Sequence, residues 1–298
     1  RPAPARRFPT SGPDMTAFNP PDPAAVAQDV MRSLHEDLQG GDVTAQLLEN
    51  DIEQGYIIAK EAAVICGRPW FDACFRQLDP DITFDWRVAE GQSVPANTVI
   101  VTFRGRARAL LSAERSALNF LQTLSATATQ TAAFAHALAG TGTRVLDTRK
   151  TLPGLRQAQK YAVRVGGGMN HRMGLFDAVM LKENHIHAEG SIAKAVAKAR
   201  AAYPDIPVIV EVESLAELRE ALASDCNRIL IDDFSDADMR EAVNTASGRK
   251  PLEVSGSVSL ERLKAIAEAG VDFVSVGSIT KNIRAIDFSM RLGNPPDA

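Results

Sequence analysis

Six short apolar runs, separated by helical patterns, follow Gly140 and constrain the fold of this chain more than any other feature of its sequence. Repeated strand–helix units predict a parallel sheet, and six consecutive units favour a barrel over an open sheet. Because a complete barrel has eight units, we expect an incomplete barrel, unless short strands escape the pattern. The apolar runs cover residues 144–147, 178–181, 208–212, 228–231, 252–254 and 273–276, and helical patterns cover residues 155–165, 191–203, 215–223, 236–246 and 260–269.

The chain before residue 140 has a different period and predicts a separate α/β layer. A helical pattern spans 23–38, and a long helix rich in small residues, suited to a subunit interface, spans 109–139. Strands are expected between them at 56–66, 82–88 and 98–103, with a short helix at 69–78. The predicted segments are a disordered leader or vector-derived remnant at 1–14 (Met15 being an alternative start), an N-terminal sandwich with its linking helix at 15–139, the barrel at 140–282, and a C-terminal segment at 283–298 that returns to the N-terminal domain.

Composition excludes several classes of function. The 33 basic and 37 acidic side chains give a net charge of −4, which disfavours nucleic-acid or membrane binding through bulk charge. No apolar run approaches the ~20 residues that cross a bilayer, and the N-terminus lacks the apolar core of a signal peptide. Cys66, Cys74 and Cys226 form no CxxC pair, so we expect buried thiols in a reducing cytoplasm.

Positive charge is concentrated in one stretch of the predicted barrel. Between residues 149 and 182 there are seven cations and one acid, Asp177. Several of the cations directly follow apolar runs, at the carboxyl ends of parallel strands, where barrel enzymes carry their active sites. We therefore expect the cations to face an anion. They are Arg149, Lys150, Arg156, Lys160, Arg164, Arg172 and Lys182.

The polar residues at the ends of the six apolar runs sort by chemical type. Cations stand at the ends of the first two runs, acids at the ends of the next two, and Gly/Ser turns at the ends of the last two. Cations grip carboxylates, acids hold a divalent cation or sugar hydroxyls, and Gly/Ser turns bind phosphate. The pattern predicts a phosphorylated sugar and a small polyanion as substrates. The residues are Thr148, Arg149 and Lys150; Lys182, Glu183, Asn184 and His185; Glu211 and Glu213; Asp232 and Asp233; Ser255, Gly256 and Ser257; and Gly277 and Ser278.

Other interpretations of single residues stay open at this point. His185 and His187 have a spacing that can bind metal, although no Cys or third His lies near them in the sequence. Lys182 at a strand end suits a Schiff base, which would leave the arginines without a role. The glycines at 166–168 are explained equally well by a simple turn.

Several long motifs together resemble one family. They are ERSALNFLQ, DTRKTLPGLR, KYAVRVGGGMNHRMGLFDAVMLKENHI, EVES, IDDFS, EVSGS and VGSITK, in that order. The sequence resembles the quinolinate phosphoribosyltransferases from about Asp42 to Leu292. The resemblance implies an N-terminal α/β sandwich joined to an incomplete TIM-like α/β barrel, the type II phosphoribosyltransferase fold, in a cytoplasmic homodimer with sites between subunits.

The resemblance also implies a reaction and a set of site residues. Quinolinate and phosphoribosyl pyrophosphate, with Mg²⁺, would give nicotinate mononucleotide, pyrophosphate and CO2. Lys150, Glu211 and Asp232 are the implied catalytic residues, and the two acids would also hold Mg²⁺. Implied substrate-binding residues are Arg115 from the neighbouring subunit, Thr148, Arg149, Lys150, His171, Arg172, Lys182, Glu211, Asp232, Ser255, Gly256, Gly277 and Lys281.

Three positions depart from the family pattern without removing a required residue. Asp233 stands where Asn is common, Ser257 where a second Gly is usual, and Ala126 where Gly is usual. Two rivals remain: a related barrel with another substrate, and a ligand sensor without catalysis. The first should lack part of the Arg and His set, and the second could dispense with Glu211 and Asp232.

Overall fold

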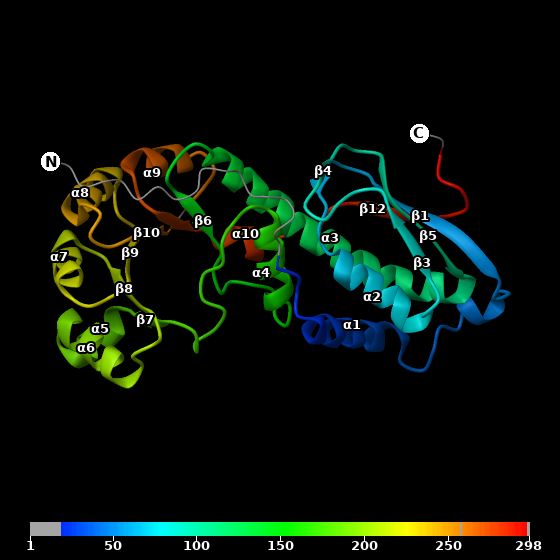
Figure 1. The fold of residues 1–298 in the computed structure, drawn as a ribbon, viewed down its shortest axis with the longest axis horizontal. Coiled ribbons are helices and arrows are strands. Elements are labelled where there is room, and N and C mark those ends of the chain that lie inside the picture. The colour runs from blue at the N-terminus through cyan, green and yellow to red at the C-terminus, as the bar shows by residue number, and fades with distance from the viewer. Residues whose placement is uncertain (1–18, 257, 297–298) are drawn as a thin grey trace.

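The computed structural model describes residues 19–256 and 258–296, which form two lobes joined by one long helix (Figure 1). The expected leader at 1–14 lies outside the described residues. Helix α3 (Ala107–Ala137) packs on the N-terminal core through Leu121 and on the barrel core through Phe134. None of the helices in these ranges has the length and hydropathy that a membrane span requires.

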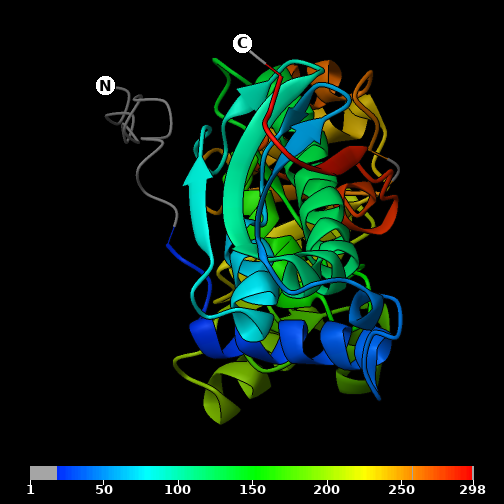
Figure 2. The ribbon, with the colours of Figure 1, turned by 90° about the vertical axis from the view of Figure 1, so that its right-hand side faces the viewer.

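The N-terminal lobe is built on a four-stranded antiparallel sheet of order β12-β1-β5-β3. Figure 2 faces this lobe and shows α1 crossing beneath the sheet. The predicted strand at 56–66 divides into two strands, because the chain bends after Ala59. The elements are α1 (Pro23–Leu38), η1 (Ala45–Leu47), β1 (Ile52–Ala59), β2 (Ala63–Val64), α2 (Arg68–Leu78), β3 (Thr83–Trp86), β4 (Ser93–Val94), β5 (Thr98–Arg106) and β12 (Phe288–Leu292).

Local signals account for the bounds of α1. The Asp22 carboxylate accepts a hydrogen bond from the Ala24 N–H at 3.0 Å, and Pro23 occupies the first helical turn, where its missing N–H costs nothing. Val26, Val30 and Leu34 recur every four residues and are buried in the N-terminal core.

The barrel lobe is an open parallel sheet of six strands in the order β6-β11-β10-β9-β8-β7, so the predicted incomplete barrel is confirmed. Successive strands β6 and β7 lie at opposite edges, and helices cover the outer face (Figure 1). The elements are β6 (Arg144–Leu146), α4 (Arg156–Val165), β7 (Val179–Leu181), α5 (Glu183–Glu189), α6 (Ile192–Ala202), β8 (Val208–Val212), α7 (Leu215–Ala223), β9 (Arg228–Asp232), α8 (Asp236–Ala246), β10 (Leu252–Ser255), α9 (Leu263–Ala269), β11 (Phe273–Ser275) and α10 (Ser278–Lys281).

A short extended segment after α4 lines the free edge of β6. The Met169 N–H donates to the Val145 carbonyl at 2.9 Å, and Met169 forms a parallel bridge with Leu146. The glycines at 166–168 make this possible: a Cβ on Gly166 would lie 2.4 Å from the Ala128 carbonyl oxygen of α3. The glycine run therefore brings α4 against α3 and returns the chain to the sheet.

Strand alternation points the acids of the barrel inward. Val208, Val210 and Val212 pack with the outer helices, so Glu211 between them faces the interior. Glu211 is in register with Leu230, and Asp232 is in register with Ser255 on the next strand. The fold thus gathers polar groups at the carboxyl ends of neighbouring strands.

The last strand, β12, returns the chain to the sheet of the N-terminal lobe. After α10 the backbone leaves the barrel, and β12 pairs antiparallel with β1, with Met290 opposite Ile57. Both side chains are buried in the N-terminal core.

Candidate active site

The loop after β6 packs against the turn after β11. The Lys150 N–H donates to Thr148 Oγ1 at 3.0 Å, and the Thr280 hydroxyl donates to the Lys150 carbonyl at 2.8 Å. A Cβ on Gly277 would lie 2.8 Å from Lys150 Cδ, so glycine lets the lysine approach this turn. Three predicted site residues, Thr148, Lys150 and Gly277, therefore lie together.

Next to that loop lies a group that we call the anchor cluster, defined as Asp147, Lys160, Asn170 and His171; all but the half-buried Asn170 are buried. Lys160 Nζ donates to Asp147 Oδ1 and, at 2.9 Å, to the His171 carbonyl. Asp147 also accepts from Asn170 Nδ2 at 2.6 Å and from the His171 N–H at 2.8 Å. Burial raises the pKa of Asp147 and lowers that of Lys160, while the attraction between their charges acts in the opposite sense on each.

Arg172 follows directly and carries its charge toward the barrel mouth. Its Nη1 donates to the Ala178 carbonyl at 3.3 Å. Burial lowers the pKa of Arg172, and the charge of Arg149 lowers it further, whereas the carboxylates of Asp177 and Glu211 raise it. Arg149 and Glu211 are thus each within electrostatic reach of Arg172. Both ring nitrogens of His171, in contrast, face protein groups.

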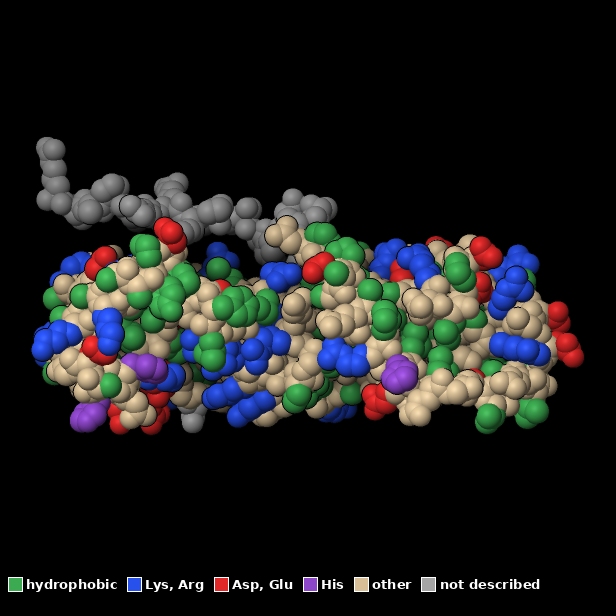
Figure 3. Space-filling view, turned by 90° about the horizontal axis from the view of Figure 1, so that it is seen from below, with side chains coloured by type: hydrophobic (Ala, Val, Ile, Leu, Met, Phe, Trp, Pro, Cys, Tyr) green, Lys and Arg blue, Asp and Glu red, His purple; other side chains and the backbone are tan. Residues whose placement is uncertain are grey.

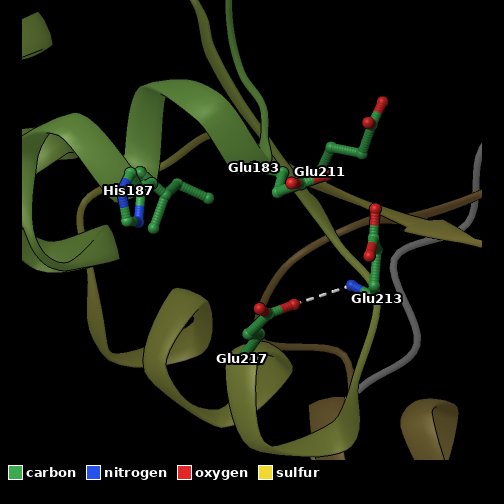
Figure 4. Close-up of a pocket in the computed structure, with 6 residues that line it drawn as sticks. Glu183, His187, Glu211, Glu213 and Glu217 are labelled. Carbon is green, nitrogen blue, oxygen red and sulfur yellow. Dashed lines mark hydrogen bonds between the residues drawn. The ribbon is translucent and has the colours of Figure 1, made fainter.

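On the opposite edge of the barrel, Lys182 and Glu211 form an ion pair. Lys182 Nζ lies 2.6 Å from Glu211 Oε2. Beside them is a hollow of about 250 Å³, which we call the acidic hollow (Figure 4). Some loss of hydration, followed by repulsion from nearby acids such as Glu183 and Glu217, raises the pKa of the exposed Glu213. The residues lining the hollow are Glu183, Ile186, His187, Glu211, Glu213 and Glu217.

The turns after β9 and β10 meet beside this hollow. Asp233 has φ +54° and Gly256 has φ +119°, and a Cβ on Gly256 would lie 3.4 Å from Asp233 Oδ1. Ser255 and Asp232 are partly exposed, and Lys281 lies exposed at the end of α10. Of the other departures, Ser257 lies outside the described residues and Ala126 is buried in the N-terminal core.

Several cations in the stretch 149–182 bind other groups of the protein, which the sequence pattern does not predict. Three of the seven cations bind groups of the protein itself, and of these only Lys160 faces an anion, as expected. Lys160 pairs with Asp147, Arg164 Nη1 donates to Asn170 Oδ1 at 2.7 Å, and Arg156 donates to the Met173 and Arg149 carbonyls at 3.3 Å. Helix α4 is buried almost all round, so these three side chains satisfy internal acceptors.

Arg115 lies on the turn of α3 that packs in the N-terminal lobe. Its neighbours Ala113 and Ala117 belong to the N-terminal core, while the Arg115 side chain is exposed. It is therefore on the other lobe from the barrel residues. Lys and Arg side chains gather near the middle of the face seen from below in Figure 3, where the two lobes meet.

No group of three or more His, Cys, Asp or Glu side chains within residues 19–256 and 258–296 is arranged to hold a metal ion. Glu211 and Asp232 supply two carboxylates to the mouth of the barrel. Two protein carboxylates fit Mg²⁺, which commonly takes its remaining ligands from water and substrate phosphates.

Sequence reasoning missed two charged residues inside the barrel, Arg228 and Glu253. Glu253 is fully buried, 3.2 Å from Arg228 Nε and 3.3 Å from His171 Nε2. A signal was present, because Glu253 is a single acid between Leu252 and Val254 in a strand that is otherwise apolar.

Comparison with known proteins assigns the chain to a family. The family model described as quinolinate phosphoribosyl transferase, N-terminal domain, matches residues 42–125, and that of the C-terminal domain matches 127–291. The carboxylating nicotinate-nucleotide pyrophosphorylase of Mycobacterium leprae is 40% identical over 90% of this chain and 97% of its own length. The probable enzyme of that name from Synechocystis is 44% identical over 87% of this chain and 90% of its own.

A solved structure gives the same assignment. The nicotinate-nucleotide pyrophosphorylase from Francisella tularensis is 46% identical, covers 93% of this chain and 99% of its own, and superimposes with a TM-score of 0.90. The two domain models together span most of the chain. The chain belongs to the quinolinate phosphoribosyltransferase family.

Proposed function

We propose that the protein transfers phosphoribosyl from phosphoribosyl pyrophosphate to quinolinate and removes one carboxylate, yielding nicotinate mononucleotide, pyrophosphate and CO2. The observation that carries this function is that cations and acids meet at one barrel mouth. Arg149, Arg172 and Lys182 serve a dicarboxylate, while Glu211 and Asp232 serve a sugar that develops positive charge. Family membership supports the same reaction.

Quinolinate binds through its two carboxylates. Arg172 and Arg149 lie close enough for their charges to disfavour each other, so a dianion between them relieves repulsion. Arg side chains bind carboxylates through two parallel hydrogen bonds, which also fixes the plane of the ring. Lys182 joins them when it exchanges Glu211 for substrate.

The phosphoribosyl group occupies the side of the acids and the Gly/Ser turns. Departure of pyrophosphate leaves positive charge on the anomeric carbon, which the Glu211 and Asp232 carboxylates stabilise at short range. Lys150, held against the Gly277 turn, lies between the two substrates. The turns at Gly256 and Gly277 offer backbone N–H groups to phosphate, and Lys281 adds a charge.

Glu211 and Asp232 would hold Mg²⁺, which when bound neutralises charge on the departing pyrophosphate. Attack by the quinolinate nitrogen creates a pyridinium ring. That positive nitrogen stabilises the carbanion that remains when the adjacent carboxylate leaves as CO2. The protein therefore contributes mainly by placing two anions against each other and by excluding water.

We also propose a cytoplasmic homodimer in which Arg115 enters the site of the partner subunit. The exposed position of Arg115 on the N-terminal lobe supports this arrangement. Cys66, Cys74 and Cys226 are free and buried, which suits a reducing compartment. Mixing inactive Arg115→Ala subunits with inactive Lys150→Ala subunits should restore activity. If the mixture stays inactive although the subunits are shown to exchange, the shared site is contradicted.

The reaction is tested by incubating the protein with quinolinate, phosphoribosyl pyrophosphate and Mg²⁺ and following nicotinate mononucleotide by its absorbance. Product is expected from quinolinate and not from nicotinic acid, because the cations at the barrel mouth suit two carboxylates. A folded sample that makes no product would favour a related barrel with another substrate, or a sensor.

A further inference from the structure

One fully buried amide side chain links the two segments that we assign to phosphoribosyl pyrophosphate. Gln159 lies on α4, and its side chain has no exposed surface. Its Oε1 accepts a hydrogen bond from the Leu152 N–H at 2.7 Å, in the loop after β6. Its Nε2 donates to the Thr280 carbonyl at 2.8 Å, in α10. A buried amide is costly unless it is hydrogen-bonded, and both ends of this one are satisfied by segments of the site.

The orientation of the amide follows from the chemistry of its partners. A backbone N–H can only donate and a carbonyl can only accept, so Oε1 faces Leu152 and Nε2 faces Thr280. Nε2 also lies 3.4 Å from Thr127 Oγ1 on α3, and the Thr127 hydroxyl itself donates to the Thr123 carbonyl at 3.2 Å. A leucine at this position would fill much of the space and supply none of these bonds.

The Thr280 hydroxyl extends the link to Lys150. It donates to the Lys150 carbonyl at 2.8 Å, and the Thr280 side chain is fully buried. The Lys150 N–H donates in turn to Thr148 Oγ1 at 3.0 Å. The backbone of Lys150 is thereby fixed at both of its polar groups. Its side chain lies against Gly277, where a Cβ would be 2.8 Å from Lys150 Cδ.

Two arginines assigned to quinolinate are held by other contacts. The Arg149 carbonyl accepts a hydrogen bond from Arg156 Nη2 at 3.3 Å. Arg172 Nη1 donates to the Ala178 carbonyl at 3.3 Å. Loss of the Gln159 amide leaves both of these contacts in place, so its effect should fall on the other substrate.

We propose that Gln159 and Thr280 are positioning residues for the binding of phosphoribosyl pyrophosphate. Together they hold the Lys150 loop against the turn at Gly277, to which Lys281 also donates its N–H at 3.1 Å. A substrate that contacts both segments then meets them at a fixed separation, which removes the cost of ordering them on binding. This inference rests on the proposed function and adds two buried residues that act through Lys150 and the turn.

The primary test is Gln159→Leu, which removes the hydrogen bonds and keeps most of the side-chain volume. Steady-state kinetics is measured for each substrate, and quinolinate binding is measured by calorimetry without phosphoribosyl pyrophosphate. We expect kcat/KM for phosphoribosyl pyrophosphate to fall at least tenfold, while the Kd of quinolinate changes less than twofold. A fall below twofold in kcat/KM would overturn the proposal. An equal loss of quinolinate binding would also overturn it, because a general loss of packing affects both substrates.

Thr280→Val and Thr143→Val are a matched pair of variants. Each threonine is buried and donates its hydroxyl to a backbone carbonyl, Thr280 to Lys150 at 2.8 Å and Thr143 to Val271 at 2.7 Å. Thr143 precedes β6 and Val271 precedes β11, so the control bond lies at the opposite ends of these strands from the barrel mouth. Thr280→Val should lower kcat/KM for phosphoribosyl pyrophosphate at least fivefold, and Thr143→Val less than twofold. Equal losses in the two variants would overturn the proposal.

Two further variants test the bonds themselves. Thr280→Ser keeps the hydroxyl and should return kcat/KM to within twofold of the wild type, so a defect as large as that of Thr280→Val would remove the role of the hydroxyl. The double variant Gln159→Leu/Thr280→Val should lose less than the product of the two single effects, because both residues hold one segment. A loss equal to that product would overturn their joint role.

Failure of this proposal and failure of the proposed function give different results. A wild type that forms no nicotinate mononucleotide would overturn both. A wild type that forms product, beside variants that keep its kcat/KM, would overturn the positioning role and leave the proposed function standing. Should Gln159→Leu fail to fold, the comparison of Thr280→Val with Thr143→Val decides the proposal.

Discussion

The two edges of the barrel mouth are built differently. In the anchor cluster at the β6 edge, Asp147 and Lys160 are fully buried and each bonds two or more protein groups. At the β7–β8 edge, the Lys182 side chain is 47% exposed and its contact with Glu211 is a single ion pair. One edge is complete without substrate, whereas the other has charges that can change partners.

The physical consequence follows from dielectric and solvation. A buried pair loses water, so removing one member leaves an uncompensated charge. The Lys182–Glu211 pair keeps water on Lys182, whereas the Glu211 side chain is 13% exposed, so loss of this pair should change stability less than loss of a fully buried pair. Substitution of Asp147 or Lys160 in the anchor cluster should therefore act on folding, and substitution in the Lys182–Glu211 pair should act on turnover.

The largest effect is expected for Lys160→Met, which keeps the aliphatic chain and leaves Asp147 without its cation. We expect a loss of about 3–5 kcal/mol in the free energy of unfolding, measured by urea titration with circular dichroism. The matched control is Arg284→Gln, at an exposed pair with Glu61, which should cost less than about 1 kcal/mol. A loss below about 1 kcal/mol for Lys160→Met would show that the cluster is not an anchor.

The reverse behaviour is expected of Glu211→Gln. Because its carboxylate faces the developing sugar charge, kcat should fall by about 10²–10³, while the thermal midpoint stays that of the wild type. Glu241→Gln, which breaks an exposed pair with Arg219 on the outer helices, should alter neither quantity. A fall in stability that parallels the fall in kcat would remove the distinction between the two edges.

The sequence predicts the longer helices and strands better than the short elements and the order of the strands. Helix α1 at 23–38 and strand β8 at 208–212 have the predicted bounds, because caps and apolar runs are local signals. Short elements such as α10 and β12 were not predicted, since one turn or one short strand leaves little periodicity. The order β6-β11-β10 was also beyond reach, because strand pairing depends on contacts distant in sequence.

The chemistry of the site shows the same division. Charges at strand ends, such as Lys182 and Glu211, stand at the ends of apolar runs and can be recognised from that pattern. Lys160 resembles them in sequence, and only the packing of α4 shows that it is internal. Glu253 carries a local signal as a lone acid in a buried strand, but its partners His171 and Arg228 lie on other segments. Burial of a charge is thus a tertiary property.

A third carboxylate tests whether burial alone produces anchor behaviour. Burial raises the pKa of Glu90 above its ordinary 4.5, against the hydrogen bond from Gly67. The folded protein therefore holds this proton to higher pH than the unfolded chain, so the contribution of Glu90 to stability falls as pH rises from about 4.5 through the raised pKa. Unfolding of wild type and Glu90→Gln across this range should show the smaller decline in the variant. Parallel curves would contradict the shift.

The smallest effect concerns the exposed edge and its departure from the family pattern. Asp233 has φ +54°, and its carboxylate lies over Gly256, whose turn we assign to phosphate. Asn tolerates this backbone conformation as Asp does, so Asp233→Asn removes the charge and keeps the turn. We expect the KM for phosphoribosyl pyrophosphate to fall about two- to fivefold, which corresponds to the ~0.5–1 kcal/mol of an exposed charge interaction. Asp233→Ala separates charge from backbone, because Ala disfavours positive φ and should offset the gain. A higher KM in Asp233→Asn would mean that this carboxylate assists binding. The exposed edge would then have three carboxylates that contribute to the site.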